Sequence, residues 1–320
     1  MAQHFLLSTK ARTLSLAKVM RFTDEEAYDA FKAIRFAENH GEAFCPKCGS
    51  VSLYNLPRRK MWRCKDCGHQ FSVTSGTIFA SRKLAIRDYL AAIAIFTNGA
   101  KGYSALQLSR DLDCQYKTAF VLSHKLREAI ADQDRVTTVS GDVEIDGMWA
   151  GGYVKPANYK THRRDLRLAA NQSGKRQSVI VARERNGKTI TLVAKSEDEG
   201  VKPLESRIEA GSTVYADEAS HWDRMAARFN TRRINHSECY SDGEGCTNQA
   251  ESFFSRLRRS EIGIHHHVAG PYLAAYAAEM DWREDNRRVS NGSQYLAIVA
   301  AAARHPISRQ WKGYWQRRAA

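Results

Sequence analysis

The chain has 320 residues, of which 43% are hydrophobic and 10% aromatic, so it can bury more than one core. This composition excludes wholesale disorder and collagen-like repetition. No apolar run is long enough to span a bilayer, and no export signal is visible. Lys and Arg number 49 against 35 Asp and Glu, and the formal net charge of +14 favours a polyanionic partner, nucleic acid first. Charge alone fits a basic protein that is merely soluble equally well.

The first predicted element is a helix that begins after Thr23. Thr23 and Glu26 have the spacing of a capping box, and apolar residues, among them Phe31, follow at helical spacing. Gly41 is the predicted end of this region, because glycine favours the conformation in which helices stop. We assign residues 1–40 to an N-terminal helical segment.

Four of the seven cysteines form two CxxC pairs, separated by fifteen residues and each followed by glycine: Cys45, Cys48, Cys64 and Cys67. Such pairs, with glycine turns beside them, are typical of a structural Zn²⁺ site. A thioredoxin-type redox pair is the alternative, and His69 could replace Cys67 as a ligand. Residues 41–80 are therefore predicted to form a zinc ribbon. The remaining cysteines are isolated and expected to be inert: Cys114, Cys239 and Cys246.

An apolar helix is predicted at 83–98, followed by helical stretches at 104–110 and 115–130 with a short connection between them. This is the pattern of a helix-turn-helix, and we assign residues 81–135 to a DNA-binding domain of that kind. A generic helical hairpin is the alternative. The residues of the second helix expected to be exposed to base edges or phosphates are Gln115, Tyr116, Lys117, Ser123, Lys125 and Arg127.

The second half of the chain begins after the polar stretch 132–140. An alternating strand is predicted at 143–146, and strands at 177–185 and 188–194 are joined by Asn186-Gly187, a strong hairpin signal. The further predicted elements are a helix at 201–210, a strand at 213–216, a helix near 222–229, a strand around 233–236 and a helix at 248–259.

This order of elements is that of an RNase H-like mixed sheet, so the predicted fold class is α+β multidomain. A helix beginning at Pro271 and an Ala-rich helix at 298–303 are expected to pack behind it. We assign residues 136–320 to an RNase H-like catalytic domain with a C-terminal helical extension.

Three acids stand where an RNase H-like fold carries its catalytic carboxylates: Asp146, Asp217 and Glu251. Carboxylates are the hard oxygen ligands that hold two Mg²⁺ or Mn²⁺ ions about 3.5–4 Å apart for phosphoryl transfer. Each acid alone also fits a solvated surface position, and Asp142 and Glu144 share the strand face of Asp146, so the ligand assignment could shift.

Basic residues follow the third acid on the same predicted helix: Arg256, Arg258 and Arg259. Arg258 lies seven residues beyond Glu251, on nearly the same helix face, where a guanidinium could hold a phosphate. We expect this group to contact DNA phosphates, with a solvated helix face as the alternative.

Several blocks, in one order from about Phe22 to about Arg288, carry a resemblance to a known family: CPKCGS, WRCKDCGHQFSVTSGTIF, VEIDGMWAGG, VYADEAS, NQAESFFSRLRR and GIHHHVAGPYLAAYAAEMDWREDNRR. The chain resembles the DDE transposases of bacterial insertion sequences, in the subgroup with an N-terminal zinc ribbon and an RNase H-like (ISXO-type) catalytic domain. The resemblance implies that Asp146, Asp217 and Glu251 are the first, second and third catalytic acids. His266 resembles a histidine that recurs after the glutamate helix, although a run of three histidines also fits a packed or solvated cluster. The family often has an acid directly after the first aspartate, where this chain has Gly147.

The resemblance further implies a bacterial cytoplasmic, nucleoid-associated enzyme that binds double-stranded DNA as transposon ends and target. It implies structural Zn²⁺, two catalytic Mg²⁺ or Mn²⁺ ions, no membrane partner, and a homodimer or higher homo-oligomer that brings two ends together. Two alternatives stay open. One is a zinc-ribbon and helix-turn-helix regulator without catalysis, and the other is an RNase H-like nuclease without strand transfer.

Overall fold

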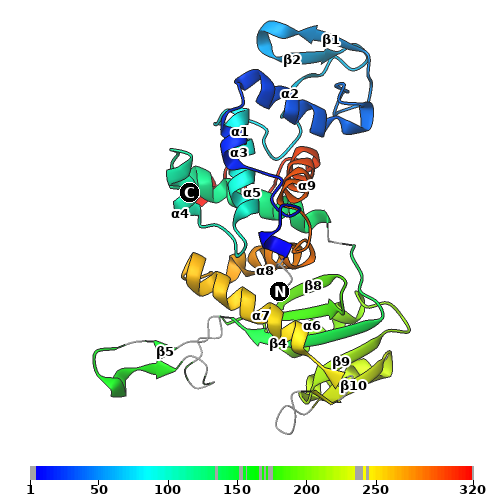
Figure 1. The fold of residues 1–320 in the computed structure, drawn as a ribbon, viewed down its shortest axis with the longest axis vertical. Helices are drawn as coiled ribbons and strands as arrows, with labels where there is room; N and C mark the ends of the chain where they lie inside the picture. The colour runs from blue at the N-terminus through cyan, green and yellow to red at the C-terminus, as the bar shows by residue number, and fades with distance from the viewer. Residues whose placement is uncertain are drawn as a thin grey trace. The chain divides into compact units, whose positions relative to one another are not determined.

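The computed structural model describes residues 5–133, 136–150, 154–155, 157–165, 168, 171, 176–234, 241–242 and 245–318. The chain forms two compact units, and the second is inserted into the sequence of the first. One unit comprises Met1–Asp132 together with Arg288–Ala320, and the other comprises Gln133–Arg287. Figure 1 labels most of the helices and strands of both.

The first unit is mainly helical, with one small three-stranded sheet. Its helices are α1 (Leu16–Met20), α2 (Asp24–Arg35), α3 (Ile86–Asn98), α4 (Ala105–Asp111), α5 (Tyr116–Gln133), α9 (Asn291–Arg304) and α10 (Tyr314–Arg318), and its strands are β1 (Leu53–Leu56), β2 (Met61–Cys64) and β3 (Gln70–Ser72). The predicted capping box begins α2, because the Thr23 side chain accepts from the Glu26 N–H and the Glu26 carboxylate accepts from the Thr23 N–H.

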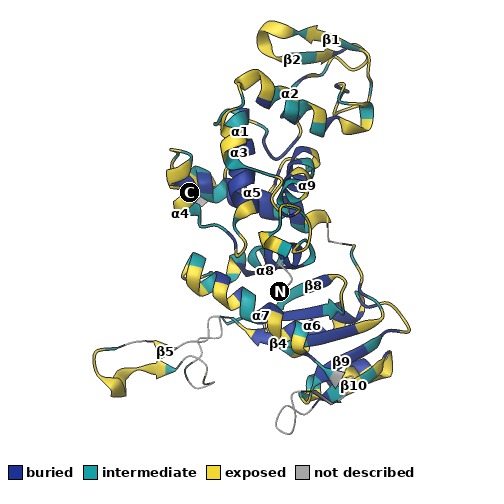
Figure 2. Cartoon of the chain, in the orientation of Figure 1, coloured by how far each residue is buried: buried dark blue, intermediate teal, exposed yellow. Residues whose placement is uncertain are grey.

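Helix α3 is the core of this unit. Every residue of α3 from Tyr89 to Thr97 is buried, and α3 packs against α1, α2 and α9. A helix that is apolar on all sides is stable only when other helices surround it. Helix α9, from the C-terminal part of the chain, supplies one of these neighbours, and Figure 2 shows the buried residues of α3 and α9 in dark blue.

The three-stranded sheet is tied to α2 by an aromatic cluster and a buried arginine. The ring of Trp62 lies 6.0 Å from Phe36 and 5.6 Å from Phe71, centroid to centroid. Arg35, at the end of α2, donates to the backbone carbonyls of Ser72, Val73 and Ser75. These contacts hold β3 against α2 and satisfy a buried guanidinium with carbonyl oxygens.

The second unit is built on a five-stranded sheet of order β10-β9-β4-β7-β8. Its sheet strands are β4 (Asp142–Trp149), β7 (Ser178–Glu184), β8 (Thr189–Ala194), β9 (Thr213–Asp217) and β10 (Asn230–Ile234). The central strand β4 is parallel to β9 and antiparallel to β7, while β10 is parallel to β9 and β8 is antiparallel to β7. Two-residue strands pair as β5 (Val154–Lys155) with β6 (Arg164–Asp165) and as β11 (Ser241–Asp242) with β12 (Gly245–Cys246).

Helices cover both faces of this sheet. Helix α6 (Glu197–Glu205) and the 3₁₀ helix Ser220–Ala227 pack on one face, around the fully buried Trp222. Helices α7 (Asn248–Ser260) and α8 (Gly270–Asp285) pack on the other face through Phe253, Leu257 and Leu273. This mixed sheet, covered on both sides, is the RNase H-like arrangement that the order of elements predicts.

Several predicted elements differ from the structure in extent or type. The predicted helix at 201–210 begins earlier, at Glu197, because Ser196 accepts from the Glu199 N–H and caps it. The predicted helix near 222–229 is the 3₁₀ helix, and the predicted strand around 233–236 is β10, which ends at Ile234. Its expected last residues, 235 and 236, lie outside the described part of the chain, as does Cys239.

The C-terminal residues lie in a different unit from the one that the sequence suggested. Residues 136–320 were expected to form one domain, but Arg288–Ala320 belongs to the compact unit of the N-terminal half. The physical reason is apolar burial, since Val299 and Trp311 are at most 3% exposed there. Trp311 stacks on His124 of α5 at 4.3 Å between ring centroids.

Candidate functional site

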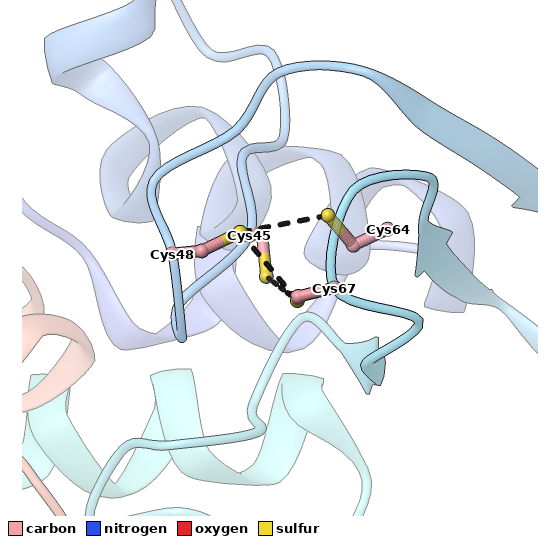
Figure 3. Close-up of side chains that lie close together, drawn as sticks. All are labelled: Cys45, Cys48, Cys64 and Cys67. Carbon is pink, nitrogen blue, oxygen red and sulfur yellow. Dashed lines mark hydrogen bonds between the residues drawn. The ribbon is translucent and has the colours of Figure 1, made fainter.

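The four cysteines of the CxxC pairs converge in the first unit. Their sulfur atoms all lie within 4.8 Å of one another, with Cys45 and Cys64 buried and the other two exposed (Figure 3). Both pairs end in the same tight turn, in which the glycine N–H donates to the carbonyl of the first cysteine, Gly49 to Cys45 and Gly68 to Cys64. Both glycines have positive φ, +76° and +68°, which side chains rarely adopt.

The sulfur spacing fits a tetrahedral zinc ion. Three of the sulfur pairs are 3.5–3.6 Å apart. Four ligands at the usual Zn–S length of about 2.3 Å would be about 3.8 Å from one another, so a small expansion accommodates the ion. His69 is not part of the cluster, because its ring stacks on Phe71. The predicted Cys₄ zinc-ribbon site is therefore formed by the described residues.

Asp146 and Asp217 lie at the same level of two adjacent parallel strands. The register pairs Asp142 with Thr213 and Glu144 with Tyr215, and continuing it by two residues brings Asp217 opposite Asp146. Side chains at intervals of two residues point to one face of a sheet, so both carboxylates belong to the face that α7 covers.

Glu251, the third predicted acid, lies in the first turn of α7 and is exposed. Its Oε1 accepts from the Thr247 hydroxyl at 3.5 Å. Among the described residues, the four cysteines are the one group of three or more His, Cys, Asp or Glu side chains close enough to hold a metal ion, so the three acids do not form such a group.

Asp146 interacts electrostatically with both other acids. Burial, the largest cause, and the negative charges of Asp217, Glu251 and Glu197 together raise the pKa of Asp146 to about 7, although the Gly147 N–H at 2.7 Å acts to lower it. A partly buried carboxyl whose pKa is raised by neighbouring carboxylates is a feature of candidate functional sites.

Glu197 of α6 is a further acid whose charge acts on Asp146, and its position in the sequence carries no signal of this proximity. A side chain on Gly147 would meet the Glu197 carboxyl carbon at 2.4 Å. The Glu197 carboxylate accepts from the Ser178 hydroxyl at 3.2 Å and lies 3.4 Å from His221 Nε2. Glycine after Asp146 therefore leaves room for a carboxylate from α6.

The start of α5 exposes three of the predicted DNA-binding residues, Gln115, Tyr116 and Lys117. Lys125 is only partly exposed, and its ammonium group donates to the Ile78 carbonyl at 2.6 Å. Burial also lowers its pKa. The expectation that Ser123 and Arg127 are exposed is wrong, because each is 1% exposed.

The reason for this burial is that α5 is covered on more than one side. The Arg127 guanidinium lies 5.8 Å from the ring centroid of Phe96 on α3. The C-terminal residue Trp315 lies 5.8 Å from Phe120, and the Lys117 ammonium lies 5.3 Å from the Trp315 ring. The N-terminal end of α5 keeps a polar exposed surface, whereas its middle is largely covered.

The three arginines predicted on α7 have different surroundings. Arg256 is ion-paired with the buried Glu284 of α8, which also binds Arg183 at 2.8 Å. Arg256 is thus engaged within the fold, whereas Arg258 and Arg259 are exposed. His266, beyond the end of α7, is exposed as well, with φ +59°.

No described helix is both long and apolar enough to cross a membrane.

Two family models match the chain, and together they cover more than half of it. An ISXO2-like transposase domain matches residues 138–285, which include all three acids, and a transposase zinc-ribbon domain matches residues 22–70, which include all four cysteines. The fold, the cysteine site and these matches define the protein as a transposase with an N-terminal zinc ribbon. A relative from Halobacterium salinarum, described as an uncharacterized protein in transposable element ISH50, is 25% identical over 249 residues, 73% of this chain and 83% of the relative. The chain belongs to the IS1595-type transposases of insertion sequences.

Proposed function

We propose that this transposase binds the terminal inverted repeats of its insertion sequence and catalyses metal-dependent DNA cleavage and strand transfer. The observation that carries the proposal is the parallel register of β4 and β9, which sets Asp146 and Asp217 side by side on the face that bears α7 and Glu251. The charge of Glu251 acts on Asp146, as does that of Asp217.

In this proposal Asp146, Asp217 and Glu251 hold two Mg²⁺ or Mn²⁺ ions. When bound, such ions polarise the scissile phosphodiester and stabilise the attacking and leaving oxygens of an in-line displacement. Water cleaves the phosphodiester at the end of the element and frees a 3′-hydroxyl. This hydroxyl then attacks a target phosphodiester, forming a new bond to its phosphorus and releasing the target's own 3′-hydroxyl, so no bond to the protein is needed.

The DNA is held by other parts of the chain. The exposed start of α5, with Gln115, Tyr116 and Lys117, has the composition of a surface that reads base edges and phosphates. The zinc ribbon adds a second contact region, and Arg258 and Arg259 add positive charge at the far end of the helix that carries Glu251. Joining two ends to one target requires at least two copies of the chain, so we include a homodimer or higher oligomer in the proposal.

The test is a joining assay with labelled oligonucleotides that carry the terminal repeats of the element, a plasmid target and Mg²⁺. Asp146→Asn, Asp217→Asn and Glu251→Gln should each reduce joining to background while leaving end binding intact, because each change removes an ionised ligand and keeps the side-chain shape. Asp142→Asn is the matched control. It lies on the same strand and face, but its carboxylate accepts from the Tyr215 hydroxyl at 3.0 Å and should not be required.

The two alternative functions give different results in this assay. Specific end binding without any cleavage, by wild-type protein that contains zinc, would overturn the proposal in favour of a DNA-binding regulator. Metal-dependent cleavage without joined product would overturn it in favour of a nuclease.

A further inference from the structure

Glu144 is a fully buried carboxylate two residues before Asp146 on β4, on the same face of the sheet. Its Oε2 accepts from the backbone N–H of Gln249 at 2.7 Å and of Ala250 at 3.2 Å. These two amides belong to the first turn of α7, where no intrahelical acceptor exists for them. The carboxylate of a strand residue therefore caps the helix that carries Glu251.

The helix has no cap of its own. Thr247 occupies the N-cap position, but its side chain makes no capping hydrogen bond. Short polar residues at this position usually satisfy the amides that Glu144 satisfies here. A negative charge at this place is also favoured by the partial positive charge of a helix N-terminus.

Arg185 balances the buried charge and holds the chain that leads into α7. Its Nε donates to the Glu144 Oε1 at 2.9 Å, and its Nη2 donates to the Cys246 carbonyl at 3.1 Å. The guanidinium also lies 4.0 Å from the ring centroid of Tyr215 on β9. The N-terminal end of α7 is thus fixed to β4 and β9, the two strands that carry Asp146 and Asp217.

We propose that Glu144 is a positioning residue, which sets the start of α7, and with it Glu251, at a fixed distance from Asp146. Glu251 directly follows Ala250, whose amide Glu144 binds, and Asp146 is separated from Glu144 by a single residue. One carboxylate therefore links both acids through very short stretches of backbone. The inference rests on the proposed function, because it assigns Glu251 to the acidic site.

A Glu144–Arg185 salt bridge that only stabilises the fold would also explain why Glu144 is buried. It predicts a different effect of substituting Glu144 from the one that a positioning role predicts. Removing a bond that only stabilises the fold lowers the fraction of folded protein and leaves the properties of the folded site unchanged. Removing a bond that positions a ligand weakens cation binding in the folded protein, since groups that orient metal ligands typically change metal affinity about tenfold or more.

The experiment compares wild type with Glu144→Gln, at a temperature where both are folded and zinc-loaded. We expect hydrogen exchange of the Gln249 and Ala250 amides to become about fivefold faster, as for loss of a helix cap. We also expect the Mg²⁺ concentration at half-maximal joining to rise about tenfold, with end binding unchanged.

The matched control is Asp281→Asn on α8. Asp281 is likewise a buried carboxylate, and it accepts from a backbone N–H of another element, that of Thr191 on β8, at 3.0 Å. Its bonds hold α8 to β8 rather than α7 to β4, so its substitution should lower unfolding stability and leave both the α7 amides and the Mg²⁺ midpoint at wild-type values.

A second variant covers the case in which Glu144→Gln alone does not fold, because Arg185 would then be left with an uncompensated charge. Glu144→Gln with Arg185→Gln removes both charges and should show the same two effects. Unchanged α7 exchange together with an unchanged Mg²⁺ midpoint, in whichever variant folds, would overturn the positioning role. If wild-type protein joins no DNA at any Mg²⁺ concentration, the proposed function fails instead, and the exchange of the two amides still decides whether Glu144 caps α7.

Discussion

At the scale of single residues, the environment of Asp146 has a measurable consequence for stability. Burial raises its pKa from 3.8 to about 7, so the folded protein holds a proton that the unfolded chain releases at lower pH. The stabilising contribution of this proton is fully present below pH 3.8 and is lost as the pH rises through about 7.

We therefore predict that Asp146→Asn stabilises the protein relative to wild type as the pH is raised from about 5 to about 8, in buffer with zinc bound but without Mg²⁺ or Mn²⁺. The asparagine has no charge to bury. Adding Mg²⁺ at about pH 8 should reduce the difference in stability between the two proteins, because a cation that binds only the folded site stabilises wild type. Thermal unfolding at several pH values measures the effect. The same dependence of the melting temperature on pH in both proteins would contradict the prediction.

The surroundings of Gly147 show how one missing side chain changes the composition of the site. The sequence has glycine directly after Asp146, and the structure brings Glu197 of α6 into the space that a side chain would fill. The charge of Glu197 thereby acts on Asp146, although this carboxylate comes from another element. No local pattern around Glu197 could have indicated this, because the approach depends on how α6 packs on the sheet.

At the scale of secondary-structure elements, the zinc ribbon has little apolar area of its own. Its strands have three or four residues each, and Tyr54 is 57% exposed. Sheets of this size need a metal or a neighbouring element for stability.

We predict that Cys45→Ser abolishes zinc binding and unfolds residues 45–72 locally, since structural zinc contributes about 10 kcal/mol or more to the folding of such sites. Metal analysis and hydrogen exchange of the three strands provide the measurements. Cys114→Ser, outside the cluster, should retain zinc and the protection of these strands, and equal zinc content in the two variants would contradict the assignment.

Helix α5 allows a comparison between two lysines of the same helix. Lys117 is exposed, whereas the Lys125 ammonium binds the Ile78 carbonyl within the fold. A lysine that contacts a phosphate releases a counterion on binding and contributes about 0.9 to the slope of log affinity against log salt concentration.

We predict that Lys117→Ala weakens binding to DNA ends and lowers the salt slope by about 1. Lys125→Ala should leave this slope unchanged, even where it lowers stability. Binding measured by fluorescence anisotropy across a salt series distinguishes the two variants, and identical slopes would show that the start of α5 does not contact phosphate.

At the scale of the whole molecule, the first unit is built from the two ends of the chain. Helix α9 packs on α2 and α3, and Asn291 accepts at 2.8 Å from the backbone N–H groups of Thr13 and Leu14. Trp311 is 3% exposed and is in contact with Phe120 and His124 of α5. The first unit therefore forms fully only after Arg288–Ala320 has been synthesised.

We predict that Trp311→Ala lowers the unfolding free energy of this unit by about 3–5 kcal/mol, the usual cost of removing a buried tryptophan. Urea denaturation measures the loss of unfolding free energy. Hydrogen exchange of α5 and of β4 then shows which of the two units is destabilised. Trp149→Ala in the second unit, at a position that is 36% exposed, should leave the exchange of α5 unchanged. Equal effects of both substitutions on α5 would contradict the assignment of the C-terminal residues to the first unit.

The sequence by itself determined the features that depend on neighbouring residues. The capping box at Thr23, the Cys₄ cluster and the hairpin at Asn186-Gly187 follow from spacings of a few residues, and the structure has all three. The order of strands and helices was enough to predict the mixed sheet, because short connections leave few ways to assemble it.

Only the tertiary structure decided which charged groups face solvent and which are used inside the fold. Arg256 pairs with Glu284, and Glu144 binds the amides of α7. In each case the partner is far away in the sequence, so no local pattern identifies it. Burial depends on what a distant segment covers, and for the same reason the C-terminal helices joined the N-terminal unit rather than the sheet that precedes them in the chain.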